Sequence, residues 1–579
     1  MKSIKYIVLA LSFVAVLSCN KFLDKKPLDK FTDDNFWTSE NNVQTFANTF
    51  YGQFSGYGNG NSYGVFYFPT LNDNQASNGF TQWSYTNVPA SISLWSSGYT
   101  ELRRANLMID RIPGIASMSD AAKNNWIGVA RLYRALMHYQ LVRAFGDIIY
   151  VDKVLDVTDE DKELYLYGDR QDRDLVMDKV LEDLNFAVAN ITMNPTSRVL
   201  FNANVANAIK SEICLYEGTF CKYRSAADGQ KPADASRANK FLTEAKNASQ
   251  AIMSNSMYSL NSSYIGNYNS DDLKDNQEMI LYKHYVTGAL VHSTIDYTCS
   301  STMQSGMSKD AFDSYLFTDG NPLATTTLDK SDHPKYDATT KNLLMNDLLK
   351  VRDARLSAAI DSVLMYRGNG YVRFDVGMET TSSTGYGVYK FDNSKFPVIY
   401  RNQTSSNYSD APIYWLSNIL LNYAEACAEL GSITQADLDK SINLLRKRAK
   451  LPNLTTSPAA DPANNMGVSN IIWEVRRERR VELMYDNNDR YWSLIRWHQL
   501  DKLDTKNHPN QVLGAYVMDD PIMSDPAANK PTVNGAGYID ASQGLNRLYE
   551  AKHYLYPIPS GQIDLYKAAG KTLTQNYGW

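Results

Sequence analysis

Residues 471–497 read IIWEVRRERRVELMYDNNDRYWSLIRW, a stretch that combines dense charge with large apolar side chains. At helical spacing one stripe runs through Ile471, Val475, Glu478, Glu482 and Tyr485, so two carboxylates share a face with apolar groups. An amphipathic surface helix would have one polar face, and this stretch has none. The pattern therefore predicts a helix packed on several sides, whose Arg and Glu side chains neutralise one another because an unpaired buried charge is costly.

Glu478 and Glu482 allow two interpretations. One turn apart among apolar groups, they could be catalytic carboxylates with shifted pKa values. Alternatively, they belong to an Arg–Glu network that locks helices together. Five nearby arginines would keep both carboxylates ionised, and an ionised carboxylate cannot act as a general acid: Arg476, Arg477, Arg479, Arg480 and Arg490. We favour the structural interpretation. The Asp-Asn-Asn run at 486–488 predicts a break before a second helix over about 490–500.

The chain begins with a predicted targeting segment. Two lysines precede an apolar run over residues 7–17 that is too short to span a bilayer. The run ends in Leu-Ser-Cys at Cys19, which resembles a bacterial lipobox, where the Cys is lipid-modified and becomes the N-terminus after cleavage. We therefore expect a lipoprotein signal peptide over 1–18, a lipid anchor at Cys19 and a polar tether over 19–34. Plain secretory cleavage after Ser18 is the alternative.

The composition argues against a nucleic-acid partner and supplies many aromatic rings that a binding surface can use. The formal net charge of −5 gives no basic excess for nucleic acid. The chain has 39 Tyr, 9 Trp and 20 Phe, and such rings serve both helix cores and binding surfaces. Beyond Cys19, four cysteines remain, too few for a disulfide scaffold, and we interpret them as small buried side chains: Cys214, Cys221, Cys299 and Cys427.

Hydrophobic spacing of three and four predicts helices at both ends of the chain. They cover about 40–54, 91–112, 119–145, 172–191, 204–223, 234–254, 412–430, 435–450, 471–486 and 490–500. Residues 55–89 have no helical period. The middle, about 257–409, is rich in Gly, Ser, Thr, Asn and Tyr, and alternation over 371–376 predicts small β-hairpins. We expect a mostly α fold with one domain over 35–579. Paired helices with Ala at their crossings are typical of tetratricopeptide (TPR) hairpins, although no strict period of 34 is present.

Seven blocks, in order along the chain, resemble the SusD/RagB family of outer-membrane nutrient-binding lipoproteins. They are Cys19–Pro27, Leu94–Asn106, Arg131–Asp147, Asn418–Ala426, Ile442–Pro452, the RRERRVEL run at 476–483 and Tyr554–Trp579. The resemblance implies a scaffold of about four TPR-like hairpins whose long loops carry a glycan site. It also implies a non-catalytic, lipid-anchored binder on the surface of a Gram-negative bacterium. Such a protein acts as a lid on a SusC-like, TonB-dependent barrel and passes oligosaccharides to it.

The sequence carries no catalytic motif that we recognise. Its seven histidines form no H-E-x-x-H and no metal-ligand spacing, and there is no G-x-S-x-G elbow or Walker loop. Residues 267–272 are rich in oxygen ligands but lack the EF-hand pattern, so we interpret them as a solvated turn. We therefore expect no enzyme activity, no cofactor and no bound metal.

A neutral sugar has an apolar C–H face and a rim of hydroxyls, which an exposed aromatic ring and polar loop side chains complement. The predicted glycan contacts are Asp73, Asn74, Trp83, Tyr85, Arg367, Tyr371, Tyr389 and Tyr400. Trp83 leads this group, and we expect Trp83→Ala to weaken glycan binding without changing the melting temperature. We expect the helix at 471–486 to lie away from the ligand.

Two other functions remain open. A surface glycoside hydrolase needs two carboxylates roughly 5 Å or 6.5–9.5 Å apart across a cleft. The loops offer no Asp/Glu pair of that kind. A TPR-like scaffold that binds no glycan would instead bind protein on its concave face.

Overall fold

The computed structural model describes residues 36–77, 82–155, 166–299, 305–374 and 379–579. The predicted signal peptide, the Cys19 anchor and the tether lie outside these ranges. Within them, each helix is too short or too polar to cross a membrane.

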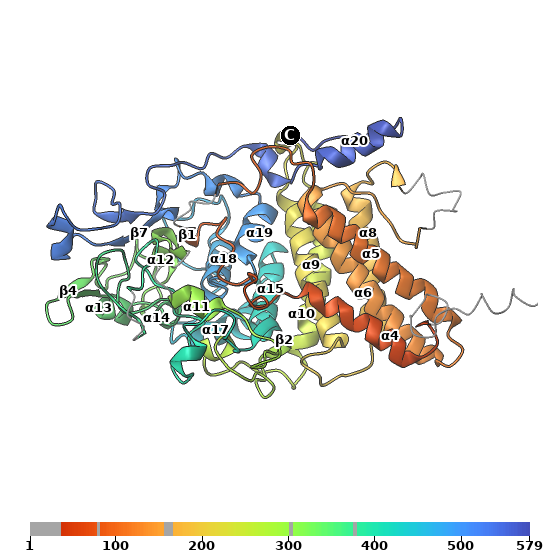
Figure 1. Cartoon of the computed structure of the whole chain (residues 1–579), viewed down its shortest axis with the longest axis horizontal. Helices are drawn as coiled ribbons and strands as arrows, with labels where there is room; N and C mark the ends of the chain where they lie inside the picture. The colour runs from red at the N-terminus through yellow and green to blue at the C-terminus, as the bar shows by residue number, and fades with distance from the viewer. Residues whose placement is uncertain (1–35, 78–81, 156–165, 300–304, 375–378) are drawn as a thin grey trace, which may run out of the picture.

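Helices dominate the N-terminal half (Figure 1). They are α4 (Glu40–Ala47), α5 (Ser93–Arg111), α6 (Asp120–Phe145), α8 (Arg173–Asn190), α9 (Ala203–Tyr223) and α10 (Ala235–Met253). Two of them begin at serine caps. Ser39 Oγ accepts a hydrogen bond from the Asn42 amide, and Ser119 Oγ accepts one from the Ala122 amide. The predicted helical ranges hold here to within a few residues, except that α4 gives way to a 3-10 turn after Ala47.

These helices pack side by side in chain order: α5 on α6, α6 on α8, α8 on α9 and α9 on α10, with α15 (Leu416–Glu429) against α10. Glycines at the crossings allow the close approach. A Cβ on Gly98 of α5 would lie 2.8 Å from Leu141 Cδ2 of α6, and one on Gly218 of α9 would lie 2.7 Å from Leu242 Cγ of α10. Paired antiparallel helices of this kind confirm the predicted TPR-like, mostly α scaffold.

Short antiparallel strand pairs occur within the loop-rich middle, between the middle and its flanking segments, and in the C-terminal part, and short helices lie in the middle itself. The strand pairs are β1 (Gln75–Ser77) with β3 (Ser305–Met307), β2 (Met279–Lys283) with β6 (Ala411–Trp415), β4 (Lys335–Asp337) with β5 (Asn342–Leu344), and β7 (Leu513–Tyr516) with β8 (Tyr538–Asp540). The helices are α11 (Thr294–Cys299), α12 (Lys309–Ser314), α13 (Asn346–Lys350) and α14 (Ala354–Ala359). Among the described residues of the whole chain, the 3-10 helices are η1 (Asn48–Gln53), η2 (Ile112–Gly114), η3 (Ala226–Asp228), η4 (Ile265–Asn267), η5 (Val398–Tyr400), η6 (Leu500–Leu503), η7 (Pro509–Gln511), η8 (Pro521–Ser524) and η9 (Ala551–Tyr554).

The hairpin predicted over 371–376 is absent from residues 371–374, the part of that range that the structure describes. Residues 371–374 form no strand, and 375–376 lie outside the described ranges. The Arg373 amide donates to the Thr380 hydroxyl at 3.1 Å, so a side chain takes the place of a ladder partner. Among the described residues of the middle segment, the local hairpin is β4–β5.

The C-terminal helices are α15, α16 (Gln435–Asp439), α17 (Ile442–Arg448), α18 (Asn470–Glu482), α19 (Asp489–Arg496) and α20 (Ser560–Ala568). Two predicted boundaries were wrong. Residues 411–415 pair with β2 and extend as β6 before α15 begins, and the helix predicted over 435–450 divides at Lys440–Ser441. The predicted break after α18 is present. Asn487 and Asn488 adopt left-handed φ angles of 47° and 55°, which Asn tolerates better than most residues.

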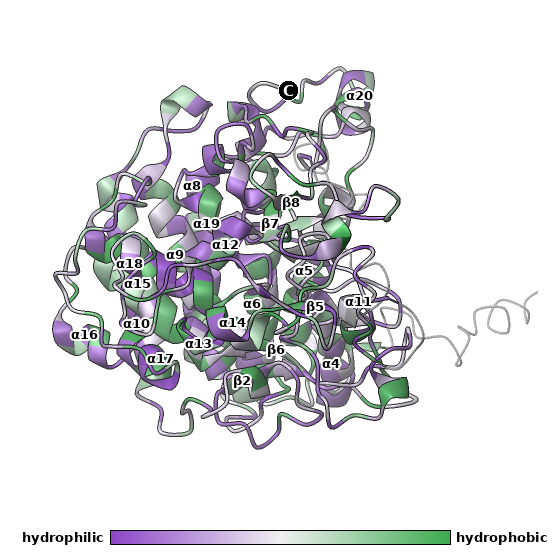
Figure 2. Ribbon diagram, turned by 90° about the vertical axis from the view of Figure 1, so that its left-hand side faces the viewer, coloured by the Kyte–Doolittle hydropathy of each residue, from purple (hydrophilic) through white to green (hydrophobic). Residues whose placement is uncertain are grey.

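The centre of the molecule is polar as well as apolar. α15, α18 and α19 lie between the N-terminal helices and the loop-rich part (Figure 1). Hydrophilic and hydrophobic segments alternate through this interior (Figure 2). Arg476 ranks with Trp415 and Trp497 among the largest fully buried side chains. This arrangement requires that the buried charges be paired.

Candidate functional site

The charged groups of α18 form a buried network. Arg355 from α14 pairs with Glu478 at 2.6 Å and with Glu482 at 2.9 Å, and Arg446 pairs with Glu478 at 2.9 Å. Arg448 also contacts Glu482. Burial alone would raise the pKa of Glu478, but Arg355 and Arg446 outweigh burial and hold that pKa below its usual value. An ionised carboxylate held in this way cannot donate a proton, which supports the structural interpretation of Glu478. For Glu482 the same interpretation rests on its ion pairs with Arg355 and Arg448.

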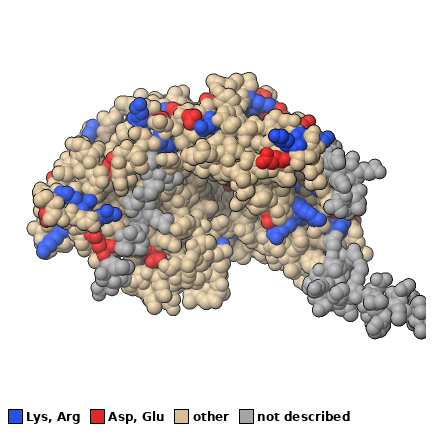
Figure 3. Space-filling model, turned by 45° about the horizontal axis from the view of Figure 1, so that its top comes forward, with Lys and Arg blue, Asp and Glu red and all other residues tan. Residues whose placement is uncertain are grey.

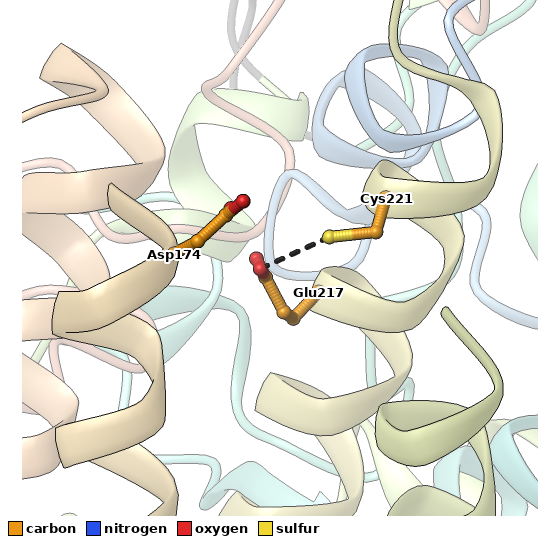
Figure 4. A group of neighbouring side chains, drawn as sticks. All are labelled: Asp174, Glu217 and Cys221. Carbon is orange, nitrogen blue, oxygen red and sulfur yellow. Dashed lines mark hydrogen bonds between the residues drawn. The ribbon is translucent and has the colours of Figure 1, made fainter. Parts of the chain in front are cut away.

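Three potential metal ligands meet between α8 and α9 (Figure 4). Asp174 comes from α8, whereas Glu217 and Cys221 come from α9, and the Cys221 thiol donates to Glu217 Oε1 at 3.2 Å. Guanidinium groups already bind both carboxylates: Arg173 lies 2.6 Å from Glu217, and Arg224 lies 2.7 Å from Asp174. Burial raises the pKa of the Cys221 thiol well above its usual range, which keeps it protonated. The group is therefore an ion-pair junction rather than a cation site.

Asp73 and Asn74 are buried, contrary to the expectation that they are exposed on a loop. Asp73 accepts hydrogen bonds from Arg490 Nε at 2.7 Å and Nη2 at 2.6 Å, and Asn74 Oδ1 accepts one from Arg480 Nε at 2.8 Å. Burial would raise the pKa of Asp73, but Arg480 and Arg490 outweigh it and hold that pKa well below its usual range. The two side chains thus attach the first long loop to α18 and α19.

Trp83 and Tyr85 are half-buried against the C-terminal segment. The Trp83 ring stacks on His553 with centroids 4.0 Å apart, and its Nε1 donates to the Leu548 carbonyl at 2.6 Å. The Tyr85 ring meets Tyr556 edge-on at 5.0 Å. One ring face and the indole N–H of Trp83 are therefore already used within the protein.

The other four predicted contacts lie in the middle segment. Arg367 is exposed, and Tyr371 is half-buried. Tyr389 is half-buried beneath the Arg373 guanidinium, 5.3 Å from the ring centroid. Tyr400 is half-buried with its ring 5.4 Å from that of Tyr408. These four residues and the first-loop residues have different neighbours and are not brought together by these contacts.

An exposed aromatic group that sequence reasoning missed is formed by Tyr63, Phe68 and Tyr297; we call it the aromatic platform. Tyr63 is 56% exposed and stacks on Phe68 with centroids 4.5 Å apart and an interplanar angle of 17°. Tyr297 of α11 meets both rings nearly at right angles, at 5.5 Å and 5.4 Å. The mutual contacts hold the rings in place, while the exposure of Tyr63 leaves area for a ligand.

Polar groups border the platform. Thr404 Oγ1 donates to Asp296 Oδ2 at 2.9 Å, and the Ser405 hydroxyl contacts Asn61 Oδ1. Asn407 is fully buried and accepts from the Ile295 and Asp296 amides of α11. These bonds fix α11 against the 404–407 segment. A rigid ring group with amide and hydroxyl groups beside it suits a ligand that has both an apolar face and hydroxyls.

The platform could be recognised only in part from the sequence. Tyr63 stands in the Gly- and Asn-rich run GYGNGNSYGVFYF, the composition of an exposed loop. Tyr297 belongs to a six-residue helix far away in the chain, and no local pattern links it to Tyr63.

At a larger scale, the surface is hollowed on one face, with acidic and basic side chains scattered around the hollow (Figure 3).

Two family models match this chain. Residues 249–579 match the model described as SusD family, and residues 21–215 match one described as starch-binding associating with outer membrane. Among curated proteins, a SusD-like protein of Bacteroides ovatus is 25% identical over 204 residues, covering 33% of this chain and 35% of the relative. SusD-like protein P25 of Formosa agariphila is 24% identical over 210 residues, covering 33% and 38%. The matched region thus spans little more than a third of these relatives.

Solved structures match along nearly the whole chain. A SusD-like carbohydrate binding protein from Bacteroides fragilis NCTC 9343 superposes with a TM-score of 0.68 at 20% identity, covering 92% of this chain and 99% of its own. A second SusD-like protein of that organism gives 0.66 at 21% identity, covering 96% and 100%. A crystal structure with xylogluco-oligosaccharide gives 0.57 at 18% identity, covering 91% and 97%. At these identities the likeness concerns the fold.

Proposed function

Because this chain belongs to the SusD family, we propose that it is a glycan-binding lipoprotein on the cell surface of a Gram-negative bacterium. In this proposal it captures oligosaccharide or polysaccharide and delivers it to a SusC-like, TonB-dependent transporter in the outer membrane. Support comes from the family description that names starch binding and outer-membrane association, and from relatives described as carbohydrate binding or containing an oligosaccharide. The proposal makes the protein a binder without catalytic activity.

The aromatic platform is the observation that carries the glycan part of the proposal. We assign the apolar face of a sugar to the exposed Tyr63 ring, and its hydroxyls to the polar groups around Asn61 and Thr404. In the same proposal Asp73 and Asn74 hold the first loop in place, since Arg480 and Arg490 engage their side chains. Arg367, Tyr371, Tyr389 and Tyr400 remain predicted contacts for the ends of a longer glycan.

The proposal also includes the chain's organisation: a signal peptide over 1–18, lipidation at Cys19, a tether to residue 34 and one domain from residue 35 onward. The lipobox-like sequence supports the anchor. Cell fractionation tests it. Cys19→Ala is expected to move the protein from the membrane fraction to the soluble exported fraction. A variant that stays with the membrane would contradict the anchor.

Isothermal titration calorimetry against a panel of neutral glycans tests the binding function. We expect binding to at least one glycan class and no release of reducing sugar from it. Release of reducing sugar would support the alternative of a surface glycoside hydrolase. The glycan proposal would be contradicted if the protein bound no glycan of the panel but bound the barrel partner tightly. That result would favour a protein-binding scaffold.

A further inference from the structure

A cavity of about 340 Å³ lies beside α18, within the size range of small-molecule sites. Its walls come from α12, α18, Asp73, Arg490 of α19 and three segments over residues 322–324, 461–466 and 502–511. We propose that this cavity binds one neutral sugar unit of the same glycan that contacts the aromatic platform. This inference rests on the proposed glycan-binding function and adds a second subsite to it. It also departs from the expectation that the helix over 471–486 lies away from the ligand.

The cavity has a fixed aromatic wall. Trp473 of α18 is half-buried, and its Nε1 donates to Asp461 Oδ2 at 3.0 Å, which sets the orientation of the indole. Pro322, Leu323 and Met466 supply further apolar lining. A rigid ring among aliphatic groups offers an apolar surface to the C–H face of a sugar without an ordering cost on binding.

The charges in the wall favour an uncharged ligand. Three arginines that line the cavity each have a carboxylate partner that also lines it. Arg480 lies 2.7 Å from Asp310, Arg490 lies 2.6 Å from Asp73, and Arg477 contacts Asp461. A charged ligand would have to compete with these ion pairs, whereas a hydroxyl can add a hydrogen bond to a paired group.

Two polar atoms of lining residues lack a hydrogen-bond partner among the residues that the structure describes. Asp313 Oδ1 is buried without a donor, while Oδ2 of the same carboxylate accepts from Lys309 at 2.9 Å. Arg476 Nε is buried without an acceptor, although Nη2 of that side chain binds Glu429 at 3.0 Å. Both atoms lie beneath the cavity surface, so a sugar hydroxyl reaches either of them only when the neighbouring wall shifts.

The cavity is close to the aromatic platform along the chain. Phe68 belongs to the platform and Asp73 to the cavity wall, and five residues can span at most about 18 Å. A glycan that extends from the platform past residue 73 into the cavity would engage both subsites. Simultaneous engagement makes the second contact intramolecular, so affinity should rise with chain length beyond what either subsite gives alone.

Filling the cavity tests the inference without removing any of its contacts. Ala324 is exposed at the cavity wall, and the adjacent Thr325 is exposed without lining it. We expect Ala324→Trp to lower the affinity for the longest bound glycan at least tenfold, and Thr325→Trp to change it less than twofold. Titration calorimetry measures both, using the purified full-length exported protein and a glycan that the wild type binds.

A fluorescence measurement covers the case in which Ala324→Trp folds poorly. A sugar in the cavity contacts Trp473, so saturating glycan should change tryptophan emission in the wild type, and this change should be lost in Trp473→Phe. Unchanged affinity in a folded Ala324→Trp variant, or the same emission change in Trp473→Phe, would overturn the cavity subsite. If Tyr63→Ala still lowered glycan affinity about tenfold or more, the proposed function would stand. Failure of the wild type to bind any glycan would instead overturn the proposed function itself.

Discussion

Arg355 Nη1 and Glu478 Oε1 lie 2.6 Å apart, with both side chains at most 3% exposed, although they come from distant parts of the chain. Arg355 belongs to α14 in the loop-rich middle, and Glu478 belongs to α18 in the C-terminal part. Asp353 holds the same guanidinium at 2.7 Å. This buried junction ties the middle segment to the helical scaffold. Because of this junction, we expect the middle segment and the helical scaffold to unfold together.

Removing Glu478 should therefore destabilise the whole protein. Glu478→Ala leaves Arg355 and Arg446 without part of their counter-charge, and we expect a loss of about 3–5 kcal/mol in the free energy of unfolding. Urea denaturation measures this loss, and glycan affinity under native conditions should not change. Glu182→Ala is the control, because its pair with Lys179 is exposed and should contribute less than about 1 kcal/mol. An unchanged midpoint for Glu478→Ala would refute the role of the junction.

Protonation of Glu425 should lower the free energy of unfolding at acidic pH. Burial would raise the pKa of Glu425, but Arg496 and Arg479 outweigh it and lower that pKa from 4.5 to about 2. Because the folded-state pKa is depressed, the contribution is fully present above pH 4.5 and is lost as pH falls toward 2. A shift of this size corresponds to about 3 kcal/mol. Unfolding free energies measured between pH 6 and pH 2.5 should show the loss.

The matched variant for this test is Glu425→Gln. It should be several kcal/mol less stable than the wild type near neutral pH, because Arg479 and Arg496 lose a buried counter-charge. Its disadvantage should shrink by about 3 kcal/mol toward pH 2, since the variant has no carboxylate to protonate at that position. A difference that stays constant with pH would show that Glu425 does not titrate as inferred.

Local signals in the sequence predicted most of the scaffold. Ser39 and Ser119 cap helices at the positions their residue types favour, and apolar spacing located the helices between them. The density of Arg and Glu around Glu478 predicted ion pairing within the chain. That prediction needed only the cost of an unpaired buried charge, which holds in any fold.

Features that depend on distant partners could not be predicted in this way. Residues 411–415 form a strand because β2 pairs with them, and the same apolar run also fits the start of a helix. Asp73 stands in a polar loop sequence of the kind that contacts ligands, but its side chain is buried and paired with Arg490. The aromatic platform needs Tyr63 and Tyr297 together, and only the tertiary fold brings them into contact.

Trp83 now leads to a different expectation from the one drawn from the sequence. Trp83→Ala removes the stack on His553 and the hydrogen bond to the Leu548 carbonyl, so we expect a loss of about 2–3 kcal/mol in stability. The melting temperature should fall by several degrees, measured by differential scanning calorimetry. Trp83→Phe, which keeps a ring for stacking, should recover part of the loss. Unchanged melting with weakened glycan binding would restore the earlier prediction of a ligand contact.

Tyr63→Ala should show the opposite behaviour to Trp83→Ala. The Tyr63 ring is 56% exposed and stacks on Phe68, so its loss removes the outer ring of the platform while the core stays filled. We expect glycan affinity to fall about tenfold or more, in line with the loss of a stacking ring, and the melting temperature to stay within about a degree. Tyr577→Ala is a matched control, because Tyr577 is 55% exposed and lies outside the platform, and it should bind glycan as the wild type does. Equal affinities for Tyr63→Ala and the wild type would move the glycan site away from the aromatic platform.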